Sequence, residues 1–400
     1  MVTDTSIVAT TQPGKLTLLS LFVVNFALAP TTMVVTLLLL DIAETFNSST
    51  GVMGQVQTLS SILAVACALI MGILTVRFKP KTLLLAGLAF VVISAVGCFL
   101  SVNFTMMLIS YALSGLGVAI ALPMTITMIA ELYPVERRTG VIGITGSGGM
   151  VSYMIGAPIA SYIAGIGGWR TAFLWYVIPV TAASLLLAFK GLPEPTPISG
   201  GSENRAGLLD GFRGVASNRS ALACLGATAF MMGSWQFLSL YSISFYRVRF
   251  QISTGLASLV ILGMSLCATL SSLTAARVMK KLGRKRTCVL SSIICTVFLV
   301  AFPVIPDLWL SMAARFVSGL VGPLAYIISS SLALELVPEF RGVMMSMNSA
   351  AFNTGIALGS ALGGALLLSS SYETVGVVLG SFMIVPAIIY QFKIIYPGPE

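Results

Sequence analysis

The sequence predicts an all-α membrane protein with twelve transmembrane helices in two pseudo-symmetric bundles of six. Three observations predict this fold class. Of the 400 residues, 57% are hydrophobic and 9% are charged, whereas soluble domains carry roughly 25% charged residues. The chain also contains a dozen long apolar runs, and one polar motif occurs at the same place in each half. These features exclude a soluble globular domain.

The apolar runs have the length of helical membrane crossings. A helix needs about 20 residues to span the hydrocarbon core of a bilayer. The runs lack the alternating pattern of a β-barrel, so helices are the remaining way to satisfy the backbone polar groups in lipid. The expected spans are residues 16–40, 52–76, 82–101, 105–130, 140–165, 170–190, 220–243, 255–278, 287–305, 308–334, 342–368 and 373–392.

A long polar stretch separates the sixth span from the seventh. It is rich in Pro, Gly and Ser, a composition typical of a linker. We therefore expect an N-terminal six-helix bundle over residues 1–190, a cytoplasmic linker over 191–219 and a C-terminal six-helix bundle over 220–400.

The net charge of +9 is spread over the loops between spans, which argues against a nucleic-acid partner. If the N-terminus is inside, nearly all Lys and Arg residues fall in cytoplasmic segments. The outer loops then hold only Arg170, Arg247 and Arg249. By the positive-inside rule both termini are cytoplasmic, and we expect a multi-pass protein of the cell membrane.

The repeated motif relates the two halves of the chain. ELYPVERRTG begins at Glu131, and ELVPEFRG begins at Glu335, 204 positions later. Arg137 and Arg341, inside the two motifs, keep the same interval. Tandem halves with even numbers of spans face the same way and are related by an axis along the membrane normal. Such a pair encloses a cleft between the halves.

At this point the chain resembles the major facilitator superfamily over nearly its full length. The loop RVMKKLGRKR after the eighth span is similar to the family's signature loop, and GILTVRFKPK after the second span is its first-half counterpart. The Asp of the family pattern is replaced by Lys280 in one loop and by Val76 in the other. The resemblance implies conformational gating by the matching residues of these loops and of the repeated motif, namely Gly72, Arg77, Arg137, Gly283, Arg284 and Arg341.

The fifth span carries a second resemblance. Its sequence GGMVSYMIGAPIASYIAGIGGWRTAF is similar to the antiporter motif of the family's twelve-span drug:proton antiporter branch, with Gly156 and Pro158 in the Gly-x-Pro place. Glycines allow neighbouring helices to approach closely, and Pro158 bends the helix. The resemblance implies proton-coupled efflux, with both residues acting in the conformational change.

Several catalytic chemistries lack their residues. The chain contains no histidine, which excludes Ser-His-Asp triads and HExxH zinc sites. It also lacks the GxxxxGK[ST] loop that cradles nucleotide phosphates. We therefore expect no enzyme activity, no cofactor and no metal.

Arg315 lies about seven residues into the tenth span, where a charged side chain costs roughly 2.5–3.5 kcal/mol to insert. Charges at membrane depth are functional candidates for that reason. Its sequence RFVSG matches an Arg-x-x-x-Gly pattern that the family places in span four, where the equivalent residue here is Tyr111. Two interpretations remain open: a substrate-binding charge, or a helix-packing Arg satisfied by backbone carbonyls.

Other polar and aromatic residues at membrane depth are candidates for a substrate site. Trp235 and Gln236 are the best pair, because an aromatic face beside an amide suits a flat, weakly polar ligand. Interhelical hydrogen bonding is the alternative role for each Asn or Gln. The candidates are Asn25, Gln57, Tyr111, Tyr153, Trp235, Gln236, Arg315, Tyr326 and Asn353.

We expect a monomeric secondary transporter that works by alternating access, with a small-molecule substrate, protons and the lipid bilayer as partners. Asp41, at the outer end of the first span, is the candidate proton site, and a solvated helix cap is its alternative role. Proton-coupled efflux of amphipathic or drug-like molecules is favoured. The alternatives are uptake of a small organic anion with Arg315 as charge clamp, and a transporter-like sensor without transport.

Overall fold

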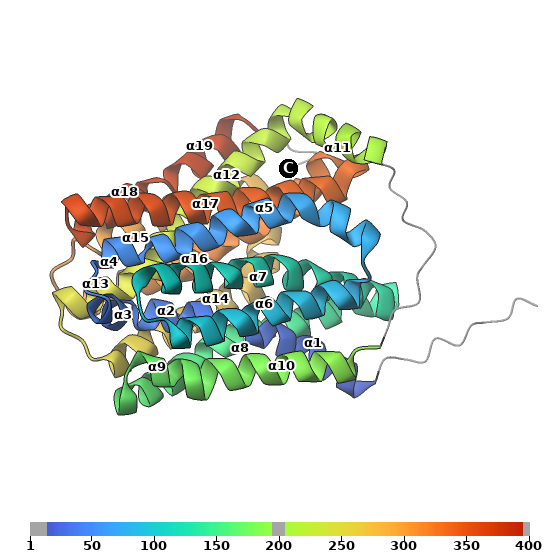
Figure 1. The fold of residues 1–400 in the computed structure, drawn as a ribbon. Helices are drawn as coiled ribbons and strands as arrows, with labels where there is room; N and C mark the ends of the chain where they lie inside the picture. The colour runs from blue at the N-terminus through green and yellow to red at the C-terminus, as the bar shows by residue number, and fades with distance from the viewer. Residues whose placement is uncertain (1–13, 194–204, 395–400) are drawn as a thin grey trace, which may run out of the picture.

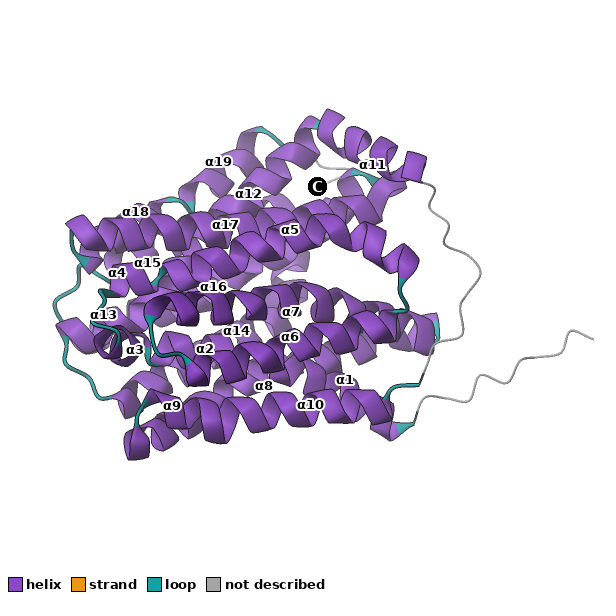
Figure 2. Cartoon of the chain, viewed as in Figure 1, coloured by secondary structure: helices purple, strands orange, loops and turns teal. Residues whose placement is uncertain are grey.

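The computed structural model describes residues 14–193 and 205–394, and within these ranges every regular element is helical (Figures 1 and 2). The elements in chain order are α1 (Lys15–Ala27), α2 (Pro30–Leu37), α3 (Leu39–Thr45), α4 (Thr50–Met53), α5 (Gln55–Arg77), α6 (Pro80–Leu100), α7 (Phe104–Leu132), α8 (Val135–Gly167), α9 (Trp169–Ala172), η1 (Phe173–Val177), α10 (Ile178–Gly191), α11 (Arg205–Ser217), α12 (Arg219–Gln236), η2 (Phe237–Tyr241), α13 (Ser242–Arg249), α14 (Thr254–Leu282), α15 (Arg284–Ala301), α16 (Leu308–Leu336), η3 (Pro338–Phe340), α17 (Arg341–Ser369), α18 (Tyr372–Ser381) and α19 (Ile384–Phe392).

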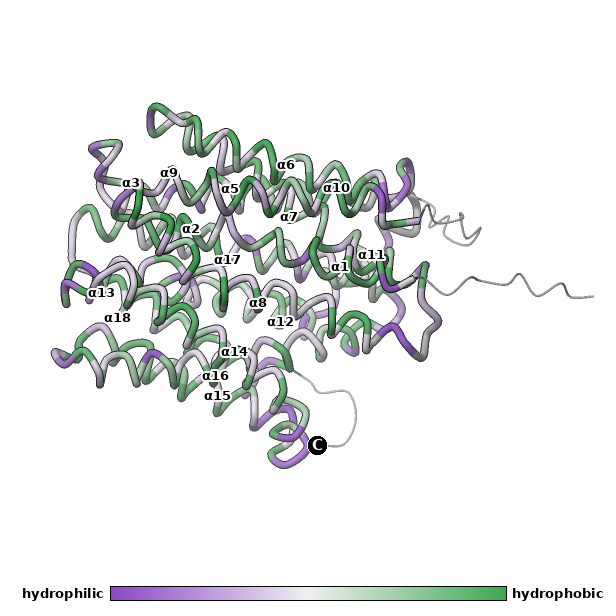
Figure 3. Tube along the Cα trace, turned by 90° about the horizontal axis from the view of Figure 1, so that it is seen from below, coloured by the Kyte–Doolittle hydropathy of each residue, from purple (hydrophilic) through white to green (hydrophobic). Residues whose placement is uncertain are grey.

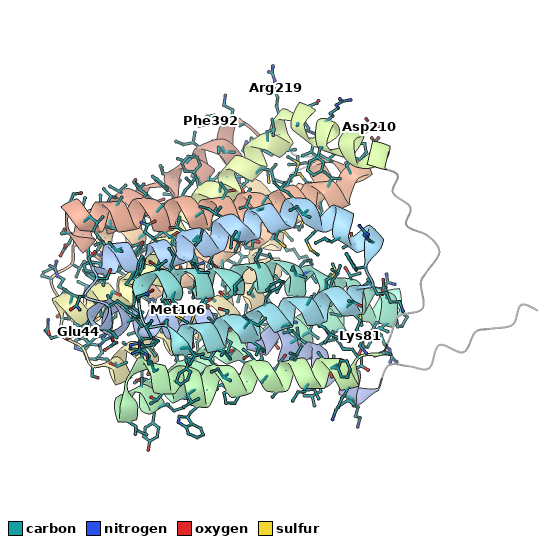
Figure 4. All side chains as sticks on the ribbon, in the orientation of Figure 1. Glu44, Lys81, Met106, Asp210, Arg219 and Phe392 are labelled. Carbon is teal, nitrogen blue, oxygen red and sulfur yellow. The ribbon has the colours of Figure 1, made fainter. Side chains whose placement is uncertain are left out.

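The helices form a bundle whose polar residues gather at its two ends (Figure 3). In the described residues, eleven helical segments are long and apolar enough to cross a membrane. The one predicted span not among them is the ninth, residues 287–305, which corresponds to α15; this helix is 18 residues long and begins with three basic residues. Among the labelled side chains of Figure 4, Glu44 lies at one end of the bundle, and Lys81 and Asp210 lie toward the other. The protein is therefore an all-helical, multi-pass membrane protein.

The two halves repeat in structure as they do in sequence. Helix α1 begins at Lys15 and α12 begins at Arg219, which is 204 positions later. Helix α7 and its counterpart α16 are both 29 residues long, and the same interval separates their starts and their ends. We call α1–α10 the first half and α12–α19 the second half. Because the interval is constant, each residue of one half has an equivalent in the other.

An internal tie is also repeated, with different chemistry in each half. In the first half Trp169 Nε1 donates a 2.9 Å hydrogen bond to Thr45 Oγ1. The equivalent residues of the second half are Arg249 and Glu373, which form an ion pair. Each tie joins the end of a half's first span to the start of its sixth span. The same structural requirement is met by a neutral bond in one half and by a charged bond in the other.

The first predicted span is not one continuous helix. Helix α1 ends at Ala27, α2 starts at Pro30, and α3 starts at Leu39. Proline lacks a backbone N–H and suits the first turn of a new helix, so Pro30 explains the first break. Its consequence is a short helix α2 whose side chains Thr32 and Thr36 reach a cavity between the halves.

The seventh predicted span differs from expectation in two ways. It contains the π-helical segment η2, and it extends to Arg249 instead of ending at residue 243. Arg247 and Arg249 therefore lie on helix α13 and not in a loop. A π-helical turn changes the direction of the side chains that follow it and is often found at functional sites. Here η2 borders the same cavity as α2.

Candidate functional site

Two connected cavities lie between the halves. The first, of about 480 Å³, is bounded by α2, α5, α8, α12, η2, α13, α14, α16 and α17, and we call it the Arg315 chamber. The second, of about 560 Å³, is bounded by α2, α5, α7, α16 and α17, and we call it the linker-side chamber. Both are lined by Thr32, Gln57, Phe352 and Ile356. Each volume is in the range typical of small-molecule sites.

Arg315 is buried at the wall of the first chamber, with 3% of its surface exposed. Its Nε donates to Ser242 Oγ at 3.1 Å, and its Nη2 donates to the carbonyl oxygen of Leu238 at 3.2 Å. Two nitrogens of the guanidinium thus brace η2 and the start of α13. The third nitrogen, Nη1, is buried and has no hydrogen-bond partner in the described part of the chain.

The charge of Arg315 is not neutralised within the cavities. Among the described residues that line either chamber, Arg315 is the only charged residue. A buried charge without a counter-ion is unfavourable, because it has lost its hydration and gained no Coulomb partner. An anion beside Arg315 would neutralise this charge.

Trp235 and Gln236 both line the Arg315 chamber. A Cβ atom at Gly322 would lie 3.1 Å from Trp235 Cζ3, so the glycine leaves room for the indole. Ser239 donates to Gln236 Oε1 at 3.3 Å. The pair therefore presents an aromatic face beside the guanidinium, together with an amide whose oxygen already accepts one hydrogen bond.

Tyr111, the first-half equivalent of Arg315, holds a neutral hydrogen-bond network at the junction of the chambers. Its hydroxyl lies 2.6 Å from Gln57 Oε1 and 3.3 Å from Thr32 Oγ1. Tyr111 itself is 1% exposed and lies behind these two lining residues. Tyr153 lines the Arg315 chamber from α8. The equivalent positions thus hold a charge in one half and a phenol in the other.

Tyr326 and Asn353 line the linker-side chamber. The ring of Tyr326 packs against Phe352 with 5.5 Å between ring centroids. Asn25 lines neither chamber: its Nδ2 donates to the carbonyl of Leu21 at 3.0 Å, and its Cβ packs near Gly148. Of the nine substrate-site candidates, the structure brings seven to the cavities, with Tyr111 just behind them and Asn25 away from them.

The seam between the halves is closed at the end opposite the linker, which we call the far end. Arg247 forms a bidentate ion pair with Asp41 across the seam. Thr50 Oγ1 accepts a 2.9 Å hydrogen bond from Tyr372, which lies in the other half. A Cβ atom at Gly51 would lie 2.6 Å from the carbonyl oxygen of Gly364, so the backbones of the halves touch there. Asp41, the candidate proton site, thus lies at the closed end of the seam.

The predicted gating residues lie at several places. A Cβ at Gly156 would lie 2.1 Å from Tyr176 Oη, and Pro158 lies inside α8. Gly283 has φ +79°, a left-handed conformation that glycine adopts without strain and that ends α14. Arg284, the next residue, pairs with Glu335.

The four remaining gating candidates lie at the linker side. Arg77 ends α5 and Arg137 lies in the first turn of α8, both with exposed side chains. Arg341 begins α17. Gly72 lies within α5, and the side chain of Arg341 lies outside the described residues.

Sequence reasoning missed several residues that line the Arg315 chamber, including Thr32, Thr36 and Ser239. The repeat offered a signal for one of them. Thr32 is the first-half equivalent of Gln236, because the two lie 204 positions apart. Applying the interval to every candidate would have found Thr32 but not Ser239, whose exposure to the cavity depends on the π-helical turn.

Comparison with known proteins gives a consistent family assignment. The sequence profile described as Major Facilitator Superfamily matches residues 20–249 and 223–400. Two uncharacterized MFS-type transporters of Bacillus subtilis (strain 168) are each 24% identical to the chain. YwfA aligns over 92% of this chain and 89% of its own length, and YceJ over 88% and 89%.

Solved structures share the fold. The nucleoside transporter NupG superposes with a TM-score of 0.76 at 14% identity, covering 94% of this chain and 98% of NupG. A D-xylose-proton symporter gives 0.74 at 16% identity, with 95% and 97% covered. A bacterial homolog of the human lysosomal transporter Spinster, inward-facing and occupied, gives 0.74 at 15% identity, with 94% and 96% covered.

Proposed function

Because the chain belongs to the Major Facilitator Superfamily, we propose that it carries a small amphipathic anion across the membrane by alternating access, with Arg315 as the anion site. The family consists of transporters, and the chain is accordingly not an enzyme. The substrate lies in the Arg315 chamber between Trp235 on α12 and the residues of α8 and α14 that form the opposite wall.

The observation that carries this proposal is the free Nη1 of Arg315. Arg315 is 3% exposed, two nitrogens of its guanidinium are held by Ser242 and Leu238, and the third faces no acceptor in the described residues. A carboxylate placed there would form a charge-assisted hydrogen bond and neutralise the buried charge. A cation would meet uncompensated repulsion, since no acidic residue in the described part of the chain lines the chamber.

The arrangement of the cavities supports alternating access. The seam is closed at the far end by the pairs Asp41–Arg247 and Thr50–Tyr372. The linker-side chamber continues from Gln57 toward the linker, and Ile126 in its wall is still 50% exposed. With the predicted orientation of the loops, this is a conformation that opens to the cytoplasm of a cell-membrane protein.

A second candidate function is proton-coupled export of drug-like molecules. The antiporter-like sequence around Gly156 and Pro158 favours it, as do the methionines Met150 and Met264 in the chamber wall, which adapt to varied ligands. Asp41 would then carry the proton. The two functions differ in the charge of the transported molecule, so one flux assay separates them.

The test compares three probes of one shape: 1-naphthoate, its neutral amide and 1-naphthylmethylamine. Uptake of each is measured in proteoliposomes. We expect wild-type protein to prefer the carboxylate, Arg315→Gln to lower its uptake by at least about tenfold, and Arg315→Lys to retain part of it. Arg249→Gln is the matched control, because Arg249 pairs with Glu373 outside both chambers.

Arg315 also braces η2, so the thermal midpoint of each variant is measured alongside. A folded Arg315→Gln protein that transports naphthoate at the wild-type rate would contradict the anion site. Preference for the amine over the carboxylate would favour drug export instead.

A further inference from the structure

Toward the linker, the first-half wall of the linker-side chamber is apolar, whereas next to the Arg315 chamber it is lined by Thr32, Gln57, Ser60, Ser61 and Ser114. Val118, Leu122 and Ile126 form one stripe of α7, and Ala68 and Met71 of α5 continue it. Leu122 and Ile126 expose 47% and 50% of their surface. These side chains are thus free to contact a ligand, and they offer it van der Waals contact with no hydrogen bonds.

The opposite wall, from the second half, is polar and uncharged. Ser346, Ser349 and Asn353 follow one another at helical spacing on α17, and Tyr326 adds a phenol from α16. Ser346 and Ser349 are exposed. Asn353 Nδ2 donates to the carbonyl of Ser349 at 3.0 Å, which leaves its amide oxygen without a donor among the described residues. This wall offers a row of hydrogen-bonding groups to whatever fills the chamber.

The two-faced chamber continues directly from the anion site. Thr32, Gln57, Phe352 and Ile356 border both cavities, and no Asp, Glu, Lys or Arg lines the linker-side chamber among the described residues. A ligand with its carboxylate at Arg315 and a body too long for the first chamber would therefore extend between the two unlike walls.

We infer that the substrate is a facially amphipathic monocarboxylate, with a rigid body that is hydroxylated on one face and hydrocarbon on the other. The hydroxylated face would lie on α17, and the hydrocarbon face would lie on α5 and α7. A hydroxylated steroid acid has this chemistry. The inference rests on the proposed function, because it uses Arg315 to hold the carboxylate.

The expected selectivity arises because a ligand face that does not match the wall it covers loses binding free energy, and this holds for both walls. A body without hydroxyl groups would cover the Ser349 hydroxyl and the Asn353 amide oxygen and leave both desolvated and unpaired. A site built to bond a hydroxyl group rejects the analogue that lacks it far more strongly than an apolar pocket rejects an added group. Conversely, hydroxyl groups on both faces would desolvate against Leu122 and Ile126 without partners.

The test measures binding of three probe carboxylates to the protein in lipid nanodiscs, below the micellar concentration of each probe. Cholate carries hydroxyl groups on one face, 5β-cholanate has the same skeleton without them, and 1-naphthoate fills only the Arg315 chamber. We expect cholate to bind about tenfold or more tightly than cholanate, in line with two or three lost hydrogen bonds.

Variants locate the preference on the α17 wall. In the double variant Ser349→Ala/Asn353→Leu, the ratio of cholate to cholanate affinity is expected to approach one while naphthoate affinity stays unchanged. Ser369→Ala, on the same helix at its exposed end, is the matched control and keeps the wild-type ratio.

The outcomes separate this inference from the proposed function. Equal affinity for cholate and cholanate in the wild type, with naphthoate binding that still requires Arg315, would overturn the two-faced chamber alone. A preference that survives in the double variant would overturn it as well. If the wild-type protein bound none of the three carboxylates, or if Arg315→Gln bound them as tightly as the wild type, both the two-faced chamber and the proposed function would be overturned.

Discussion

The ion pair between Arg247 and Asp41 is expected to hold the far end of the transporter closed, and Arg247→Ala tests this. Arg247 Nη2 donates to Asp41 Oδ1 at 3.0 Å, and Nη1 pairs with Oδ2. The two residues come from different halves, on α13 and α3. Opening the far end would therefore break both hydrogen bonds.

The size of the effect follows from the exposure of the pair. Fully exposed ion pairs contribute about 0–1 kcal/mol, and charge-assisted hydrogen bonds contribute about 1.5–3 kcal/mol. The Arg247 side chain is 16% exposed and that of Asp41 is 36% exposed, so solvent screens the pair in part. We expect about 1–2 kcal/mol, which lowers the ratio of far-side-closed to far-side-open molecules roughly 5- to 30-fold.

Distance measurement by electron paramagnetic resonance gives this ratio. Spin labels at Val102 and Val304, both exposed at far-side ends of helices in different halves, report the separation of the halves in a cysteine-free background. Arg249→Ala is the matched control, because Arg249 lies on the same helix but pairs with Glu373 of its own half. An unchanged ratio in Arg247→Ala, or an equal shift in the Arg249 variant, would refute the idea that the Arg247–Asp41 ion pair holds the far end closed.

Three other predictions concern packing, the hydrogen-bond network and coupling. Gly355→Ala should destabilise the protein by about 1–3 kcal/mol and so lower its thermal midpoint, because the added Cβ would lie 2.2 Å from a carbonyl oxygen of α12. The control Gly226→Ala, whose added Cβ meets nothing within 4 Å, should be neutral or stabilising. Equal losses of stability in the two variants would contradict the packing argument. Tyr111→Phe should cost about 1 kcal/mol in the same assay by removing the 2.6 Å hydrogen bond to Gln57, and an unchanged midpoint would show that the bond contributes nothing. If Asp41 carries the coupling proton, Asp41→Asn should abolish substrate accumulation driven by a pH gradient in proteoliposomes and preserve counterflow exchange of the substrate. Gradient-driven accumulation by the variant would show that Asp41 does not carry the coupling proton.

Hydropathy and the repeat predicted the fold because both are properties of long segments. A run of about 20 apolar residues has no other stable place than the bilayer, so small errors at its ends do not alter the topology. The 204-residue interval, visible in two short motifs, proved to hold for whole helices such as α7 and α16. The break before Pro30 depends on a single residue without a backbone N–H, so the hydropathy of a long segment does not reveal it.

The site was only partly predictable, because it depends on directions of side chains that periodicity does not fix. Trp235 and Gln236 were identified by their chemistry, and they line the chamber. The segment η2 was not foreseen, since nothing local in FLSLY distinguishes a π-turn from an α-turn, and Ser239 faces the cavity because of it. The ion pair of Asp41 was not predictable from local sequence, because its partner Arg247 is 206 residues away and lies beyond the predicted end of the seventh span.

The most direct test of the central claim is an experimental structure of the protein with a brominated naphthoate, in which the bromine marks the ligand. We expect the ligand in the chamber between the halves, with its carboxylate within hydrogen-bond distance of Arg315 Nη1 and its ring beside Trp235. A bound ligand elsewhere, or a carboxylate that points away from Arg315, would contradict it.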